Sequence, residues 1–341
     1  MDFDLIQKQI QGWTNSIPLL ILGSGASVPY GIPSMYTLGE HLKNSIAFSE
    51  KEDQEQFDAF KSEFNKNGDL ESTLLGMNLR PNVLNAIVCK TWELINSQDV
   101  LAYEQILQKS IDLPLSTLIN YLLSTSKKKV SIVTTNYDRI AEYASSVVNA
   151  FICNGFTQNF HGLFSNSIHK NDFSKLKGYA GQVNIWKVHG SLDWFKSIGE
   201  EYLHFPLRQN IPANFIPSIV TPGLAKYLYS HLEPYRTIFT EADSEIEQAS
   251  SYLCIGYGFN DAHVHPKLIS QIRNGKPIII ITKELTNSTK KAIIDGDCKQ
   301  YILMEQINSC DTRIYSSLFA GEKIVSNASY WTLNEYLKLI I

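Results

Sequence analysis

Four short polar stretches each follow an apolar, strand-like run of the sequence, at residues 23–27, 136–138, 189–191 and 256–261. They contain glycines, which lack a Cβ and so let a phosphate approach the backbone N–H groups. They also contain an amide, carboxylates and an imidazole, side chains that can hold water or a hydroxyl group and move protons. Together these residue types indicate a phosphate-containing ligand with acid–base chemistry beside it.

The glycine-rich stretch Gly23-Ser24-Gly25-Ala26-Ser27 is the first candidate site. It matches the dinucleotide-binding fingerprint only in part, because the sixth position is Val28 and not glycine. A helix after the turn would point its positive end at the same place. A phosphate cradle and a plain strand–turn–helix connection are therefore both open.

Three later side chains are the candidates for chemistry. Asn136 and Asp138 follow a buried strand, where they could bind a ligand, or could serve as a turn residue and a helix cap respectively. His189 stands between a strand and Gly190, a position that suits either a general base or a buried structural histidine.

Apolar runs alternate with helical periodicity along the chain, which predicts an α/β fold with a Rossmann-like parallel sheet and helices on both faces. Ligands of such sheets bind outside the carboxyl ends of the strands. The four polar stretches follow strand ends, so we expect them to converge on one crevice. The expected strands are residues 18–22, 130–134, 183–188, 252–255, 277–282 and 301–304.

The chain length of 341 residues suits one large domain with an insertion. Residues 48–127 begin with charged and amide side chains and continue with helical periodicity over 83–95, 103–111 and 115–123, which predicts a helical insertion or small subdomain. Two segments, 150–180 and 208–223, are irregular, and a small hairpin is expected between 191–195 and 202–205. We expect a single domain over 1–341, with its core near 14–47, 128–150 and 181–305, the insertion near 48–127 and C-terminal helices over 305–341.

Composition excludes several classes of protein. The net charge of −4 does not favour direct binding to nucleic acid or to an anionic membrane. Five scattered cysteines, at 89, 153, 254, 298 and 310, provide neither a disulfide framework nor a cysteine zinc module, and no other metal site is expected. The acidic N-terminus is unlike a signal peptide, and no apolar run reaches the roughly 18–20 residues that span a bilayer. A cytoplasmic protein is expected.

Taken together, the four stretches resemble the sirtuin family, and in particular the bacterial SIR2-like proteins. The matching segments, in order, are Gly23–Ser27 with Gly31-Ile32-Pro33 for the GAGxS…GIP signature, Thr134-Thr135-Asn136-Tyr137-Asp138 for the TQNxD motif, Val188-His189-Gly190-Ser191 for the catalytic histidine–glycine, and Gly256-Tyr257-Gly258 for the ribose loop. They extend over most of residues 17–285.

The departures from the family pattern matter for function. Ser34-Met35-Tyr36 stands where sirtuins have Asp-Phe-Arg, and Thr135 replaces the glutamine. The four zinc cysteines expected after the histidine are absent from the sequence. The resemblance therefore implies an NAD+ pocket without zinc and without recognition of an acyl-lysine peptide.

The resemblance implies that NAD+ is the substrate of an NAD+ glycohydrolase, which releases nicotinamide and ADP-ribose as an NAD-depleting effector of bacterial antiphage defence (abortive infection). Asn136 would position the water or the ribose hydroxyls, and Asp138 would orient the nicotinamide side or its loop. His189 would act as the base toward a ribose hydroxyl or the water. The expected NAD+-binding residues are Gly23, Ser24, Gly25, Ala26 and Ser27 at the pyrophosphate, Ile32, Pro33 and Thr135 nearby, and Gly256, Tyr257 and Gly258 beside the adenosine ribose.

Two other functions stay open at this point: a sirtuin-type protein deacylase or ADP-ribosyltransferase, and a non-catalytic sensor of NAD+ or ADP-ribose. The resemblance also implies regulation by assembly, with a homo-oligomer and a separately encoded partner such as an ATPase subunit. The insertion and the C-terminal helices are the expected contact surfaces, because they are not needed to build the crevice.

Overall fold

The computed structural model describes residues 3–221, 232–261 and 264–341. Its centre is a nine-stranded sheet that is parallel from β3 to β11, with two antiparallel strands at one edge. The predicted mixed α/β fold with a mostly parallel sheet is confirmed. The strands, in spatial order, are β13 (Glu322–Val325), β12 (Thr312–Ser316), β11 (Tyr301–Gln306), β10 (Ile278–Thr282), β9 (Tyr252–Ile255), β1 (Leu19–Leu22), β2 (Lys129–Thr134), β5 (Gln182–Lys187) and β3 (Phe151–Cys153).

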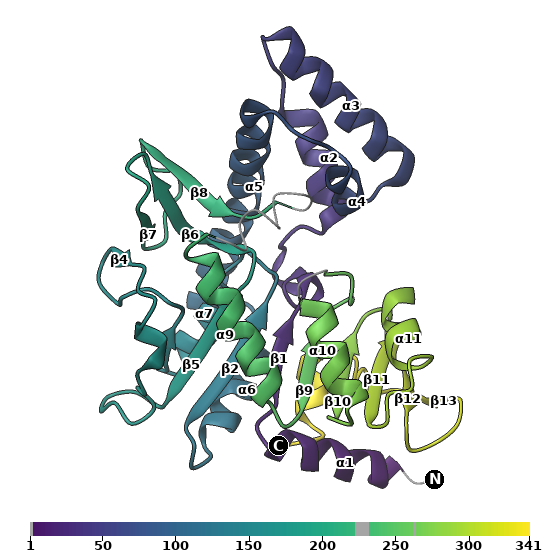
Figure 1. The fold of residues 1–341 in the computed structure, drawn as a ribbon. Helices are drawn as coiled ribbons and strands as arrows, with labels where there is room; N and C mark the ends of the chain where they lie inside the picture. The colour runs from purple at the N-terminus through teal and green to yellow at the C-terminus, as the bar shows by residue number, and fades with distance from the viewer. Residues whose placement is uncertain (1–2, 222–231, 262–263) are drawn as a thin grey trace.

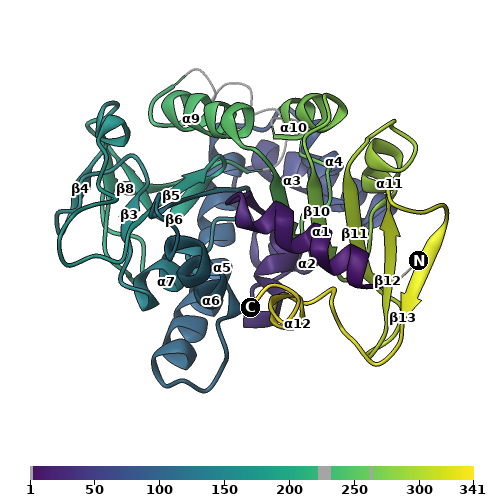
Figure 2. The ribbon, with the colours of Figure 1, turned by 90° about the horizontal axis from the view of Figure 1, so that it is seen from below.

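Helices cover both faces of this sheet, as expected (Figure 2). One face carries α9 (Tyr235–Gln248), α10 (Val264–Arg273) and α11 (Asn287–Ile293), and the other carries α1 (Phe3–Asn15), α6 (Pro114–Leu123), α7 (Ile140–Val147) and α12 (Leu333–Leu337). Side chains alternate between the faces of a strand. In β1, Leu19 and Ile21 therefore join the core under α9, and Leu20 and Leu22 join the core under α1.

A third core lies beyond one end of the sheet (Figure 1). Stacked phenylalanines of one helix, Phe57, Phe60 and Phe64, fill its centre. It is built from α2 (Met35–Ser45), α3 (Lys51–Asn67), α4 (Leu70–Leu75) and α5 (Pro81–Leu107), packed on a small antiparallel sheet of β4 (Gly162–Leu163), β7 (Tyr202–His204), β6 (Gly190–Ser197) and β8 (Phe215–Ile219). The expected hairpin corresponds to β6 and β7, which pair antiparallel.

The helices of the expected insertion are divided between two cores. Helices α3 and α4 lie in the third core together with α2, whereas α6 packs against β2 and α7 on the main sheet. Helix α5 is continuous through the break expected between 95 and 103. The polar residues Asn96 and Asp99 interrupt the apolar periodicity of this helix. Both side chains are nevertheless buried, because they form hydrogen bonds with Arg139.

The expectation of C-terminal helices over 305–341 is wrong for most of that segment. Strands β12 and β13 form an antiparallel hairpin there, and α12 is the one helix described in the segment. Thr312, Ile314 and Ser316 are buried while their neighbours are half-exposed, which is the period-two pattern of a strand. Charged residues on β13 suit the edge of a sheet.

Three short strands of the described part also lie within the segments expected to be irregular. Strands β3 and β4 fall within 150–180 and β8 within 208–223, although residues 222 and 223 lie outside the described part. Each of the three has five residues or fewer, too few for periodicity to identify them. None of the described helices combines the length and the apolar character that a bilayer crossing needs.

Candidate active site

The candidate site lies where four neighbouring strands end. The strands β9, β1, β2 and β5 are adjacent and parallel, so the loops that follow them emerge side by side. These loops begin at residues 256, 23, 135 and 188, and they carry the four predicted polar stretches. The four stretches therefore lie at one edge of the sheet.

The loops after β1 and β9 touch through their backbones. Gly25 N–H donates to Gly256 O at 3.1 Å. A Cβ at Gly23 would lie 2.4 Å from Gly256 O, and a Cβ at Gly256 would lie 2.3 Å from Gly25 C. Gly256 also has a positive φ of 57°. These glycines thus have a structural role, since no side chain fits between the two loops.

The amide of Asn136 is fixed in one orientation. Its Nδ2 donates to Gly23 O at 2.9 Å and to Ser27 Oγ at 3.0 Å. A carbonyl oxygen only accepts hydrogen bonds, so the nitrogen must face Gly23. With both hydrogens of Nδ2 engaged, Oδ1 is the polar atom of this side chain that remains available as an acceptor for a ligand.

Asp138 is buried beside this amide. Its Oδ1 accepts from Ile140 N at 3.2 Å, which is the helix-capping role considered from sequence. Its carboxylate also accepts the Ser27 hydroxyl, so Ser27 links the Asn136 amide to the Asp138 carboxylate. Burial raises the pKa of Asp138, while the Lys187 ammonium and the Ser27 hydrogen bond act to lower it.

His189 pairs with the carboxylate of Asp261, in the loop that follows β9. Its Nε2 lies 2.9 Å from Asp261 Oδ2, and each side chain is 7% exposed. Asp261 is fixed in turn, because its Oδ1 accepts from Val264 N at 3.0 Å. Gly190, with φ of 84°, lets the chain turn directly after His189, where a Cβ would meet Ser218 O at 2.0 Å.

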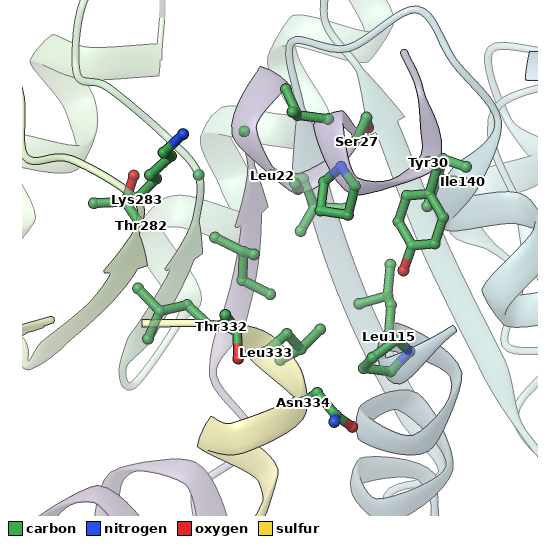
Figure 3. Close-up of a pocket in the computed structure, with 18 of the residues that line it drawn as sticks. Leu22, Ser27, Tyr30, Leu115, Ile140, Thr282, Lys283, Thr332, Leu333 and Asn334 are labelled. Carbon is green, nitrogen blue, oxygen red and sulfur yellow. The ribbon is translucent and has the colours of Figure 1, made fainter. Parts of the chain in front are cut away.

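A cavity of about 650 Å³ opens beside the glycine loop, along the carboxyl ends of β1, β2, β9 and β10 (Figure 3). Leu22, Ile255 and Ile281 form its apolar wall on the sheet. Six of the predicted site residues line it: Gly25, Ala26, Ser27, Asn136, Asp138 and Gly256. The structure therefore brings the glycine loop and the Asn136–Asp138 segment to one cavity.

The other predicted residues lie outside the lining of this cavity. His189 is in the pair with Asp261, and Thr135 is half-buried at the end of β2. Ile32 is buried in the third core, and the Tyr257 side chain is buried in the core under α9. Of the remaining four, Gly23 lies against Gly256, and the Gly258 carbonyl accepts a hydrogen bond from the Thr286 hydroxyl. Ser24 is exposed, and Pro33 is half-buried just before α2.

Sequence reasoning missed several lining residues. Lys283 follows β10 and Gln306 ends β11, so the rule on strand ends could have identified both. Tyr30 lies in the predicted loop region, and burial together with the nearby Asp112 and Asp138 carboxylates raises its pKa to about 12. Residues 331–334, just before and within α12, also line the cavity, and no motif in the sequence indicates them.

The described residues contain no group of three or more histidine, cysteine or acidic side chains arranged to hold a metal ion. The cysteines are dispersed: Cys254 lies in β9 and Cys153 in β3, and Cys310 is exposed near the C-terminus. The family's four-cysteine zinc site therefore does not fit these residues.

Solved structures similar to this chain include a Sir2 homologue in complex with NAD, with 17% identity over 89% of this chain and 88% of that chain and a TM-score of 0.45. Another is a Sir2 homologue mutant in complex with 2'-O-acetyl ADP ribose, with 16% identity, 88% and 90% coverage and a TM-score of 0.47. A third comes from work on sirtuin substrate affinity, with 13% identity, 88% and 93% coverage and a TM-score of 0.46.

No curated protein matches the chain in sequence. The family model of the SIR2-like domain matches residues 130–284. This range begins in β2 and ends just after β10, and it contains Asn136, Asp138, His189 and Gly256. Residues 130–284 of this chain are therefore similar to the SIR2-like domain.

Proposed function

We propose that this protein is an NAD+ glycohydrolase, which cleaves the nicotinamide–ribose bond with water. NAD+ and water give nicotinamide, ADP-ribose and a proton, so no other reactant is needed. The observation that carries the proposal is the fixed Asn136 amide and the buried Asp138 carboxylate on one cavity of a SIR2-like domain.

Asn136 and Asp138 suit the charge changes of this reaction. As the C–N bond breaks, positive charge develops on the ribose ring, and a preorganised carboxylate stabilises it. In our assignment Asp138 supplies that negative charge, and Asn136 Oδ1 accepts a hydrogen bond from the attacking water or from a ribose hydroxyl. Because Asn136 donates to Gly23 and Ser27, its oxygen does not have to reorient during the reaction.

His189 is the proton-accepting group in this proposal. A carboxylate held against an imidazole orients the ring, and Asp261 lies 2.9 Å from His189 Nε2. His189 does not line the cavity. The proposal therefore needs a water or a ribose hydroxyl to connect the ring to the reacting ribose.

The cavity fits a dinucleotide in size and chemistry. Its volume of about 650 Å³ falls within the range of roughly 300–1,000 Å³ that is usual for small-molecule sites. The amides of Gly25, Ala26 and Ser27 already donate within the loops, so the turn keeps its shape without a ligand. Lys283, which makes no ion pair within the described part of the chain, supplies a cation for the phosphates.

The decisive experiment is incubation of the purified full chain with NAD+, followed by chromatography of the products. Release of nicotinamide and ADP-ribose, abolished in Asn136→Ala and retained in Asn44→Ala, supports the proposal. Asn44 is exposed on α2, so its substitution controls for loss of an asparagine. Transfer of ADP-ribose to a protein, deacylation of a peptide, or binding without turnover would each replace the proposal with another function.

The cellular role we propose is depletion of NAD+ during phage infection, as a homo-oligomer or together with a separately encoded subunit such as an ATPase. The resemblance to bacterial SIR2-like defence proteins supports this role. Cells expressing the wild-type chain should lose NAD+ after infection, and cells expressing Asn136→Ala should not. Unchanged NAD+ in infected wild-type cells would contradict the role in defence and leave the enzymatic proposal to the assay above.

A further inference from the structure

The C-terminal segment, residues 331–334, forms one wall of the cavity that also contains Asn136 and Asp138. We propose that this wall receives the adenine ring of the dinucleotide, with Trp331 as the ring against which it stacks. The inference rests on the proposed function, because it takes the nicotinamide ribose to lie at Asn136 and Asp138.

Hydrogen bonds to α1 hold the C-terminal segment in place. Gln11 Nε2 donates to Leu339 O at 2.9 Å, and the hydroxyls of Thr14 and Tyr336 lie 3.0 Å apart. Thr332 accepts from Glu335 N at 3.3 Å. Helix α1, at the other end of the sequence, therefore fixes α12 and the residues before it. A wall fixed in this way loses little entropy when a ligand binds.

The position of the segment matches the adenosine end of the ligand. Figure 3 shows Thr332 and Leu333 between Thr282 and Lys283 on one side and Leu115 and Tyr30 on the other. In the same view Thr332, Leu333 and Asn334 follow one another toward Leu115. Trp331 precedes them in the sequence and lines the same cavity.

The catalytic groups belong to the opposite side of the cavity. Tyr30 lies near Ile140 in Figure 3, and Ile140 N donates to Asp138. A dinucleotide with its scissile bond at Asp138 therefore extends its adenosine half toward Thr282, in a cavity that Trp331 also lines.

The chemistry of this end suits a flat heterocycle. Trp331 is half-exposed and lines the cavity, whereas Trp13, Trp92, Trp186 and Trp194 are buried in the cores. Ile255 and Ile281 of the sheet form an apolar surface on the same cavity. Stacking of a base on an aromatic side chain is a common mode of nucleotide binding, and an apolar surface excludes water from the ring.

The test compares Trp331→Ala with Tyr330→Ala. Tyr330 is the adjacent aromatic residue, stacks on Phe3 at 5.4 Å and does not line the cavity. The KM for NAD+, the Kd of ADP-ribose and the Ki of AMP as a competitor should each rise at least about tenfold in Trp331→Ala and stay unchanged in Tyr330→Ala. ADP-ribose should also quench the tryptophan fluorescence of the wild type and not that of Trp331→Phe.

Each other outcome overturns a defined part of the inference. If Trp331→Ala cleaves NAD+ and its Kd for ADP-ribose is unchanged, the segment 331–334 does not bind the ligand. The proposed function is then unaffected. A raised KM for NAD+ with an unchanged Ki of AMP rejects adenine as the ring that stacks. A wild type that neither binds ADP-ribose nor cleaves NAD+ rejects the proposed function itself. If Trp331→Ala does not fold, Trp331→Leu serves the same comparison with a larger side chain.

Discussion

Arg139 and Asp99 form a buried ion pair, with 2.7 Å between Arg139 Nη2 and Asp99 Oδ2. Asp99 Oδ1 also accepts the backbone N–H of Arg139 at 2.7 Å, and Asn96 Oδ1 accepts from Arg139 Nη2 at 2.7 Å. Arg139 directly follows Asp138. Helix α5, which extends into the third core, therefore holds the end of the turn on which the proposed catalytic residues stand.

Asp99→Asn should destabilise the protein by about 3 kcal/mol, because it leaves the Arg139 guanidinium buried without its counter-charge. The free energy of unfolding in urea measures this loss. Glu55→Gln is the matched control, since Glu55 forms an exposed pair with Lys51 and such pairs contribute little. Equal stability of the two variants would show that the buried pair does not hold the turn in place.

The main sheet and its loops could be predicted from sequence because their signals are local. Continuous apolar runs predict buried parallel strands, and the rule on strand ends then brings Asn136 next to the glycine loop. The hydrogen bonds from Asn136 to Gly23 and Ser27 agree with that expectation. The glycines were expected to admit a phosphate, whereas the structure shows that they also admit the neighbouring loop.

The missed features depend on contacts between residues far apart in sequence. The middle of α5 looks like a break until Arg139, 40 residues after Asp99, is placed beside it. The cavity wall at Trp331 arises because α12 folds back onto α1, more than 300 residues away. His189 belongs to a predicted stretch, but its pairing with Asp261 follows from the fold of two loops. No periodicity or motif reports such partners.

Ser27→Ala should shift the acid limb of the pH–activity profile to higher pH. The Ser27 hydroxyl lowers the pKa of Asp138, which burial raises, so removing the hydroxyl raises that pKa further. Asp138 acts as a carboxylate in our proposal and is then protonated at a higher pH than in the wild type. The measurement is kcat for NAD+ hydrolysis against pH, with exposed Ser45→Ala as the control. An acid limb that stays in place would exclude Asp138 as the group that titrates.

Gly256→Ala should destabilise the protein by about 2 kcal/mol or more and abolish activity. Its Cβ would lie 2.3 Å from Gly25 C, and its φ of 57° is strained for alanine. Gly12→Ala is the matched control, because no atom lies within 4 Å of its Cβ on α1. It should stabilise the protein by about 0.5–1 kcal/mol. Thermal unfolding measures both, and a Gly256→Ala variant as stable as the wild type would contradict the tight contact between the loops.

His204→Gln should lower stability most between about pH 4 and pH 6.5. Burial alone would raise the pKa of Asp193 and lower the pKa of His204. The contact between the two side chains, with 2.8 Å from His204 Nε2 to Asp193 Oδ2, reverses both shifts. The stabilisation due to His204 is complete below the ordinary histidine pKa of 6.5 and is lost as the pH rises through its raised pKa. The stabilisation due to Asp193 is complete above the ordinary aspartate pKa of 3.8 and is lost as the pH falls through the lowered pKa of Asp193.

Within that window the variant should be less stable than the wild type by about 1–3 kcal/mol, the usual contribution of a hydrogen bond between charged groups. The difference should diminish as the pH rises through the raised pKa of His204 and the folded protein loses this charge. Unfolding in urea at pH 5.5 and at pH 9 measures it, with exposed His161→Gln as the control. A difference of the same size at both pH values would mean that His204 stabilises the fold by packing and not by its charge.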